Sequence, residues 1–168
     1  TITDDDTAAV ASVTPATEEE GVSLTHTVTM TTASATDETY PFSVAGVTAT
    51  DNVDYTTTAI FSNGVTYDPI TMSITVPAGV TSFTVTFPSI EDVLDENNET
   101  YTLSVGGVNA TGTITDDDTS TIAVNDATIE EGGVLAFTVT LSTPSATPVL
   151  FTPSFANVTT TNGDYTQT

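Results

Sequence analysis

The sequence predicts an all-β fold, an antiparallel Greek-key, immunoglobulin-like β-sandwich present as tandem repeats. Apolar and polar residues alternate with period two along several segments, and no segment has helical periodicity. Thr and Val, which favour strands, are abundant. The string Thr-Ile-Thr-Asp-Asp-Asp-Thr occurs twice, at residues 1–7 and 113–119. Self-similarity at a long spacing indicates an array of repeated units.

Strands are expected, in chain order, where the alternation is clearest. Each expected strand carries apolar residues on one face and mostly Thr or Ser on the other. Turn signals separate them, such as Asn63-Gly64 and Gly106-Gly107. The expected strands span residues 22–30, 40–44, 70–76, 83–87, 101–105 and 110–114.

Further matches define the repeat. Glu19-Glu20-Gly21 returns 111 residues later as Glu130-Glu131-Gly132, and Asp54-Tyr55-Thr56 returns 110 residues later as Asp164-Tyr165-Thr166. We therefore interpret residues 1–6 as the tail of a preceding repeat and 7–118 as a complete one. Residues 119–168 are interpreted as the first half of a second repeat, with strands at about 121–124, 135–141 and 149–155. Half a sandwich exposes an apolar face and open edges, so later sequence or another chain is expected to complete it.

Composition narrows the function. The chain has 23 Asp and Glu, no Lys or Arg, and a formal charge of −23. Nucleic acid and anionic membranes are excluded as electrostatic partners, because both require cationic side chains. The chain has no Cys, and no apolar run is long enough to span a bilayer. Sequons at Asn98, Asn109 and Asn157 matter only in a source that glycosylates secreted proteins.

Catalysis is not expected. His26 is the only imidazole, and it lies on the apolar face of its expected strand, where Phe137 is its counterpart in the second repeat. A core aromatic role explains it better than a Ser-His-Asp arrangement. Paired carboxylates could serve a glycosidase, but the chain lacks the Trp and Arg that sugar sites commonly use. The sequence therefore predicts a non-enzymatic protein.

The acidic residues gather in groups at the ends of the expected strands. In an antiparallel sandwich alternate loops share one end, so these groups are expected to converge there. Clustered carboxylates repel one another, and a divalent cation neutralises them. Carboxylates on loops suit the six to eight oxygen ligands of Ca²⁺, whereas Zn²⁺ prefers Cys and His, and Mg²⁺ keeps more water. The competing interpretation is that the acids are solvated loop charges. The groups are Asp4–Asp6, Glu18–Glu20, Asp51 with Asp54, residues 91–99, and Asp116–Asp118.

The order of these motifs resembles the Calx-beta repeat. The relevant strings are Glu-Glu-Gly at 19–21, Asp-Tyr-Thr at 54–56, the acidic run at 90–103 and the closing Gly-Thr-Ile-Thr-Asp-Asp-Asp at 112–118. Calx-beta domains are β-sandwiches that bind Ca²⁺ in the loops at one end. The resemblance departs at Glu91, where the family usually has Asp. By this resemblance the Ca²⁺ ligands are expected among Glu19, Glu20, Asp54, Glu91, Asp92, Asp116, Asp117 and Asp118.

Asp95, Glu96 and Glu99 are instead interpreted as solvated loop charges. Because Asp116–Asp118 have their own domain's loops as partners, we expect an ordered metal there and little or none at Asp4–Asp6.

Two functions fit these expectations. The first is a Ca²⁺-stiffened extender repeat in a large bacterial surface or adhesion protein, which is the context in which Calx-beta repeats occur in tandem. Its partners would be neighbouring repeats or copies of itself, and its location extracellular. The alternative is a subunit of an extracellular fibre, in which strands donated between chains complete the half-repeat. An intracellular Ca²⁺ sensor, known from exchanger relatives in that family, fits the −23 charge and the absence of Lys and Arg less well.

Overall fold

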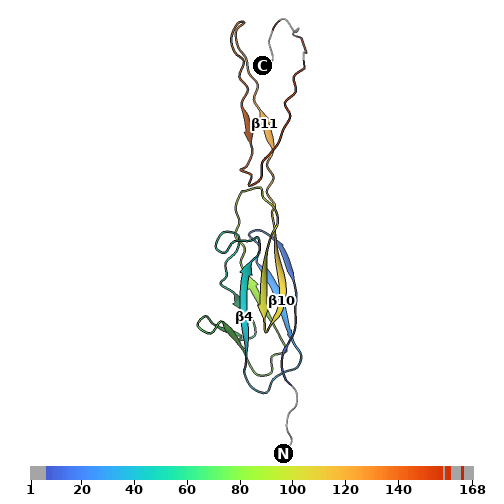
Figure 1. The fold of residues 1–168 in the computed structure, drawn as a ribbon, viewed down its shortest axis with the longest axis vertical. Helices are drawn as coiled ribbons and strands as arrows, with labels where there is room; N and C mark the ends of the chain where they lie inside the picture. Colours follow the sequence, from blue (N-terminus) through green and yellow to red (C-terminus); the bar gives the residue numbers. More distant parts are fainter. Residues whose placement is uncertain (1–6, 157, 160–163, 165–168) are drawn as a thin grey trace, which may run out of the picture.

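The computed structural model describes residues 7–156, 158–159 and 164, and these residues form an all-β structure (Figure 1). The predicted fold class is confirmed, because two sheets pack as a sandwich within residues 7–118. The first sheet has the strand order β1-β3-β8-β5 and the second the order β2-β10-β9-β4-β7-β6. In the first sheet the strands are β1 (Val10–Val13), β3 (Leu24–Met30), β5 (Ile60–Phe61) and β8 (Ser82–Phe87). In the second they are β2 (Ala16–Glu19), β4 (Glu38–Gly46), β6 (Thr66–Asp68), β7 (Ser73–Val76), β9 (Glu99–Val105) and β10 (Val108–Thr115).

One strand pairing differs from the expected antiparallel pattern. The chain leaves β1 in the first sheet and crosses at Pro15 to β2 in the second, where β2 runs parallel to β10. Proline cannot donate to a ladder, so a crossing point suits it. The parallel register aligns Glu19 with Thr115. The two segments that follow these residues therefore start next to each other.

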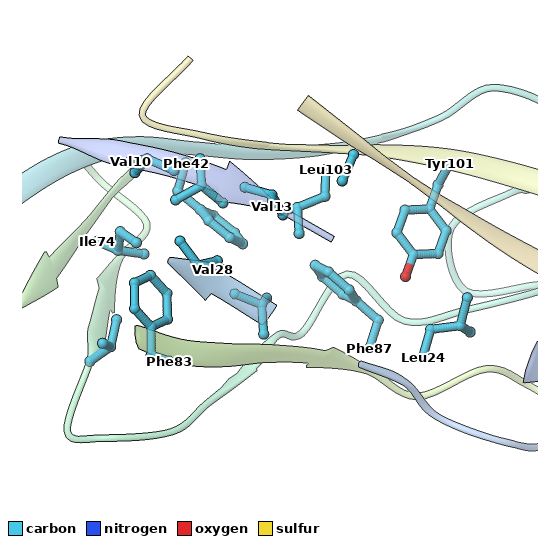
Figure 2. Close-up of a cluster of buried hydrophobic side chains, with 14 of the residues drawn as sticks. Val10, Val13, Leu24, Val28, Phe42, Ile74, Phe83, Phe87, Tyr101 and Leu103 are labelled. Carbon is cyan, nitrogen blue, oxygen red and sulfur yellow. The ribbon is translucent and has the colours of Figure 1, made fainter. Parts of the chain in front are cut away.

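The core lies between the two sheets. Along β3 the buried positions alternate with more exposed Thr residues, as the period-two pattern predicts. Figure 2 shows Phe83 and Phe87 of one sheet pointing toward Phe42 and Leu103 of the other. All buried hydrophobic residues of this core fall between Val10 and Ile114. Residues 7–118 thus contain a complete core of their own.

His26 belongs to this core, as predicted. Its side chain is 0% exposed, and its Nδ1 lies 2.7 Å from the carbonyl of Thr14. A carbonyl only accepts, so Nδ1 carries the proton. Burial lowers the pKa of His26, which favours the neutral ring. Its Nε2 is then an acceptor and receives the hydroxyl of Tyr101 at 2.9 Å.

Two strand predictions were wrong at their starts. Val22 lies in the turn before β3 and is 46% exposed. The strand predicted from residue 70 begins only at Ser73, because Met72 has φ of 51° and cannot continue an extended ladder. Ile70 and Met72 are consequently exposed.

The second repeat contributes one described hairpin, β11 (Ile122–Val124) with β12 (Val139–Leu141). Its register, Ile122 opposite Leu141, repeats that of Val10 opposite Met30 in the β1–β3 pair. The strand predicted over 135–141 is shorter than expected, and residues 149–155 form no strand. In Figure 1 this unit extends from one end of the sandwich. Among the described residues, no helix has the length and hydropathy to cross a membrane.

Candidate metal centre

Four segments bring carboxylates together at one end of the sandwich. The parallel β2–β10 pairing continues past the strands, since the N–H of Glu20 donates to the carbonyl of Thr115 at 3.1 Å. This places Glu20 beside the start of the Asp116–Asp118 segment. The loop after β4 is tied to the loop after β8, because the N–H of Ile90 donates to the carbonyl of Asp54 at 2.9 Å. Backbone pairing thus positions the acidic side chains.

The first carboxylate group contains Glu20, Asp92 and Asp118. One oxygen from each lies within 4.8 Å of the others. Glu20 is 8% exposed, and its Oε2 accepts the N–H of Asp92 at 3.3 Å. Its other oxygen, Oε1, is buried and has no hydrogen-bond partner, and Oδ2 of Asp118 is in the same condition.

The second group contains Asp54, Glu96 and Glu99, again with one oxygen from each within 4.8 Å of the others. Asp54 is 9% exposed, and its Oδ2 accepts the N–H of Thr50 at 2.5 Å. Oε2 of Glu99 is buried without a partner. Glu99 opens β9 on the same face as Tyr101, so the pleat of the strand directs it inward.

A cavity joins the two groups. It is lined by the carboxylates of Glu20, Asp54, Glu96, Glu99 and Asp116, together with Ile90, Asn97 and Ile114. Asp116 connects its walls, because its Oδ2 accepts the N–H of Glu96 at 3.2 Å. Its other oxygen, Oδ1, is buried and unpartnered. The cavity therefore concentrates negative charge and open acceptor positions in one place.

Burial and mutual repulsion disfavour ionisation here. Burial raises the pKa of Glu20 to about 7, and the charges of Asp92 and Asp116 raise it further, against backbone hydrogen bonds that lower it. Burial likewise raises the pKa of Glu99 to about 8, with Asp54 as the next cause. The pKa of Asp118 is raised by loss of hydration and by its acidic neighbours.

These features fit a hard divalent cation. The buried side-chain oxygens without partners include one each from Glu20, Glu99, Asp116 and Asp118. Unpartnered buried carboxylates are costly, and a cation bound between them removes both the desolvation and the repulsion. The polar side-chain atoms that line the cavity are oxygens apart from the amide nitrogen of Asn97. Oxygen-rich, carboxylate-dominated sites suit Ca²⁺ better than Zn²⁺.

The residues predicted as ligands divide into two sets. Glu20, Asp54, Asp92 and Asp118 belong to the two groups, and Asp116 lines the cavity. The other three are exposed and belong to neither group, namely Glu19, Glu91 and Asp117. Ligation by any of them stays a prediction. Asp4–Asp6 lie outside the described residues.

Sequence reasoning assigned Glu96 and Glu99 to solvent, whereas both line the cavity. The signal for Glu99 was present in the alternation, because residue 99 has the same parity as Tyr101 and Leu103. Glu96 had no comparable signal, since it lies in a loop whose path depends on tertiary contacts.

Comparison with known proteins adds little detail. No family model and no curated protein matches the chain. Among solved structures it is similar to the crystal structure of CBD12 from CALX1.2, with 15% identity over 79% of this chain and 68% of that chain and a TM-score of 0.46. It is also similar to BslA, described as a bacterial hydrophobin, with 16% identity over 65% of this chain and 97% of that chain and a TM-score of 0.26. Both TM-scores are low, so the case for a metal centre depends on the geometry.

Proposed function

We propose that the chain is a non-enzymatic, Ca²⁺-binding structural repeat of a large secreted surface or adhesion protein, in which the ion stiffens the connection between repeats. The observation that carries the proposal is the cavity with buried, unpartnered oxygens from Glu20, Glu99, Asp116 and Asp118. The order of acidic motifs that resembles the Calx-beta repeat supports the same ion.

The location of the cavity suggests how an ion would act mechanically. Glu20, Asp54, Asp92, Glu96, Glu99, Asp116 and Asp118 would hold it. They come from the end of β2, the loop after β4, the loop after β8, the start of β9 and the segment after β10. That last segment leads within two residues of Asp118 to Ser120, where the second repeat begins. Neutralising these carboxylates would join the segments and restrict the hinge between repeats.

Calcium titration of the full chain tests the metal site. We expect saturable binding by calorimetry and a rise in melting temperature that grows with the logarithm of free Ca²⁺ above Kd. The exchange Asp118→Asn should weaken binding, whereas Asp126→Asn, at an exposed acid in the second repeat, should leave it unchanged. A melting temperature that is the same in Ca²⁺ and in EDTA would remove the metal from the proposal.

The stiffening role needs a separate measurement. Small-angle scattering of the chain should show a narrower distribution of dimensions in Ca²⁺ than in EDTA. Binding without any change in this distribution would leave a Ca²⁺-binding repeat with no role in extension.

The extracellular location is supported by the charge of −23 and the absence of Lys and Arg, which give no cationic surface for intracellular polyanions. Partners would be neighbouring repeats or copies of the chain. Protease accessibility of the parent protein on intact cells tests the location, because an intracellular protein would be protected.

A second candidate is the fibre subunit completed by strand donation. It is favoured by the exposed apolar side chains of β11–β12, such as Val139 and Leu141. In the first repeat the equivalent strand β3 is covered on its free edge by β8. If chains complete one another, sedimentation should show concentration-dependent polymers, and Val139→Lys should abolish them. A strictly monomeric chain at high concentration would eliminate this candidate.

A further inference from the structure

The contact between the two repeats depends on Asp95. Its carboxylate Oδ2 accepts the N–H of Ser120 at 2.8 Å. Its own N–H donates to the carbonyl of Pro144 at 3.1 Å, and its carbonyl accepts the N–H of Ala146 at 2.9 Å. The hydroxyl of Ser145 also donates to that carbonyl, at 3.2 Å. The Asp95 loop is therefore held by the turn at residues 142–147 of the second repeat, which we call the socket.

The first repeat has the same turn at residues 31–36, 111 residues earlier in the sequence. In the socket the N–H of Thr147 donates to the hydroxyl of Ser145 at 3.3 Å, and in the first repeat the N–H of Thr36 donates to the hydroxyl of Ser34 at 3.1 Å. Ser34 and Ser145 are both half-buried. The local fold of the turn is thus preserved.

The attachment of the turn to the start of its repeat is preserved as well. The hydroxyl of Ser142 accepts the N–H of Thr121 at 2.9 Å, and the hydroxyl of Thr31 accepts that of Ala9 at 3.0 Å. Backbone pairing matches too, with Ser142 donating to Thr121 at 2.9 Å and Thr31 to Ala9 at 2.8 Å. Both repeats therefore present the same arrangement at the same end.

The two turns differ in what occupies them. The groups that bind the Asp95 loop correspond, in the first repeat, to the N–H of Ala8, the carbonyl of Ala33 and the N–H of Ala35. None of these three groups makes a hydrogen bond to a described residue. Ala33 and Ala35 are exposed. One feature is missing, because Ala8 lacks the hydroxyl by which Ser120 braces the turn through Thr143.

We propose that the turn at residues 31–36 is a second socket, which binds the Asp95 loop of another copy of this repeat placed before Thr7. The occupant is specified by the chain itself, since the same loop already occupies the equivalent turn of the second repeat. Each repeat then carries a loop at one end and a socket at the other, which is a heterologous, head-to-tail contact that propagates into a filament-like array. The proposal deepens the extender function, on whose repeat array it rests, and does not require the cavity to bind Ca²⁺.

The test uses a tandem chain in which residues 7–118 are followed directly by a second copy of residues 7–118, so that Asp118 precedes Thr7 as it precedes Thr119 in the natural chain. Residues 7–118 contain a complete core, so a single copy serves as the reference. Amide hydrogen exchange is measured by NMR at Ala35. We expect the Ala35 amide of the second copy to exchange at least about tenfold more slowly than in the single repeat. Equal rates would overturn the proposal.

A substitution locates the contact. Asp95→Ala in the first copy should remove the acceptor for the Ala8 amide of the second copy and speed its exchange, whereas Asp95→Asn, which keeps an oxygen acceptor, should retain part of the protection. Asp95→Ala in the second copy is the matched control, because no repeat follows it and no rate should change. Equal effects of Asp95→Ala in either copy would contradict a directional socket.

The same measurements in EDTA and in Ca²⁺ separate the two proposals. Protection of Ala35 in EDTA supports the socket whatever the outcome of the calcium titration. Protection in neither condition overturns the socket and leaves the metal site untouched.

Discussion

Glu20 is the residue at which burial and charge conflict most directly. It is 8% exposed, and one of its oxygens lacks a hydrogen-bond partner. In metal-free solution Glu20→Gln should increase the free energy of unfolding by about 1 to 3 kcal/mol, because it removes a buried charge from an acidic cavity. In saturating Ca²⁺ the variant should lose stability relative to the natural chain. Urea unfolding in both conditions measures the two signs.

The neighbouring exchange Glu19→Gln is the control, since Glu19 is exposed and should change stability by less than about 0.5 kcal/mol in either condition. If Glu20→Gln destabilises the metal-free chain, the oxygen without a partner has a favourable contact that the cavity geometry does not contain.

The raised pKa values of Glu20 and Glu99, about 7 and about 8, determine a pH dependence. A carboxyl whose pKa is higher in the folded state than in the unfolded state stabilises the fold below its unfolded value, and this stability is lost as pH rises through the folded value. In EDTA the melting temperature should therefore fall between about pH 5 and pH 8.

Calcium should reverse this trend, because its ligands must be deprotonated. With excess Ca²⁺ the stabilisation over EDTA should be larger at pH 8 than at pH 5, and calorimetry near pH 7 should register proton release. A metal-free melting temperature that rises steadily across this range would contradict the raised pKa values.

At the scale of elements, β10 shows why a strand can require glycine. Gly112 packs directly beneath the ring of Tyr101, where an added Cβ would lie 2.1 Å from the Cζ atom of the ring. Tyr101 is fully buried and bonded to His26, so it cannot move aside easily. Gly112→Ala should lower the free energy of unfolding by about 1 to 3 kcal/mol through overpacking.

Urea denaturation measures this effect, with Thr111→Ala as the control at the exposed neighbouring position. A neutral Gly112→Ala would mean that the Tyr101 ring shifts without cost, and Phe at position 101 would then be equally neutral.

The strands that the sequence predicted are those whose apolar residues face the core in strict alternation, as along β3 and β9. The short strands β5 and β6 were missed, because few residues are involved and β6 is exposed throughout. The parallel pairing of β2 was not predictable, since it depends on the crossing at Pro15 rather than on residue pattern.

For the candidate site, sequence motifs indicated which segments converge but not which side chains turn inward. Glu20 is buried while Glu19, one position earlier, is exposed, and only the placement of β2 decides between them. Asp95 was interpreted as a solvated charge, yet it joins the two repeats, because its partners are 25 or more residues away in sequence.

At the scale of the whole molecule, the two units differ in what holds them together. The sandwich buries nineteen hydrophobic residues within positions 10–114. In the second repeat the large apolar side chains are exposed, from 37% at Ile122 to 93% at Val158. With 23 acids and no Lys or Arg, no side-chain salt bridge adds to either unit. Stability therefore resides almost entirely in the first repeat.

Removing residues 119–168 should consequently leave the thermal unfolding of the sandwich nearly unchanged. The lost contacts are the few hydrogen bonds of Asp95 to Ser120, Pro144 and Ala146, which contribute modestly at a solvated junction. In EDTA we expect the free energy of unfolding of the 7–118 chain to match that of the full chain within about 1 kcal/mol, by calorimetry. Removing residues 7–13 instead should be severely destabilising, because Val10 and Val13 belong to the core. A large loss of stability in the 7–118 chain would show that the second repeat packs on the sandwich through contacts beyond the Asp95 junction.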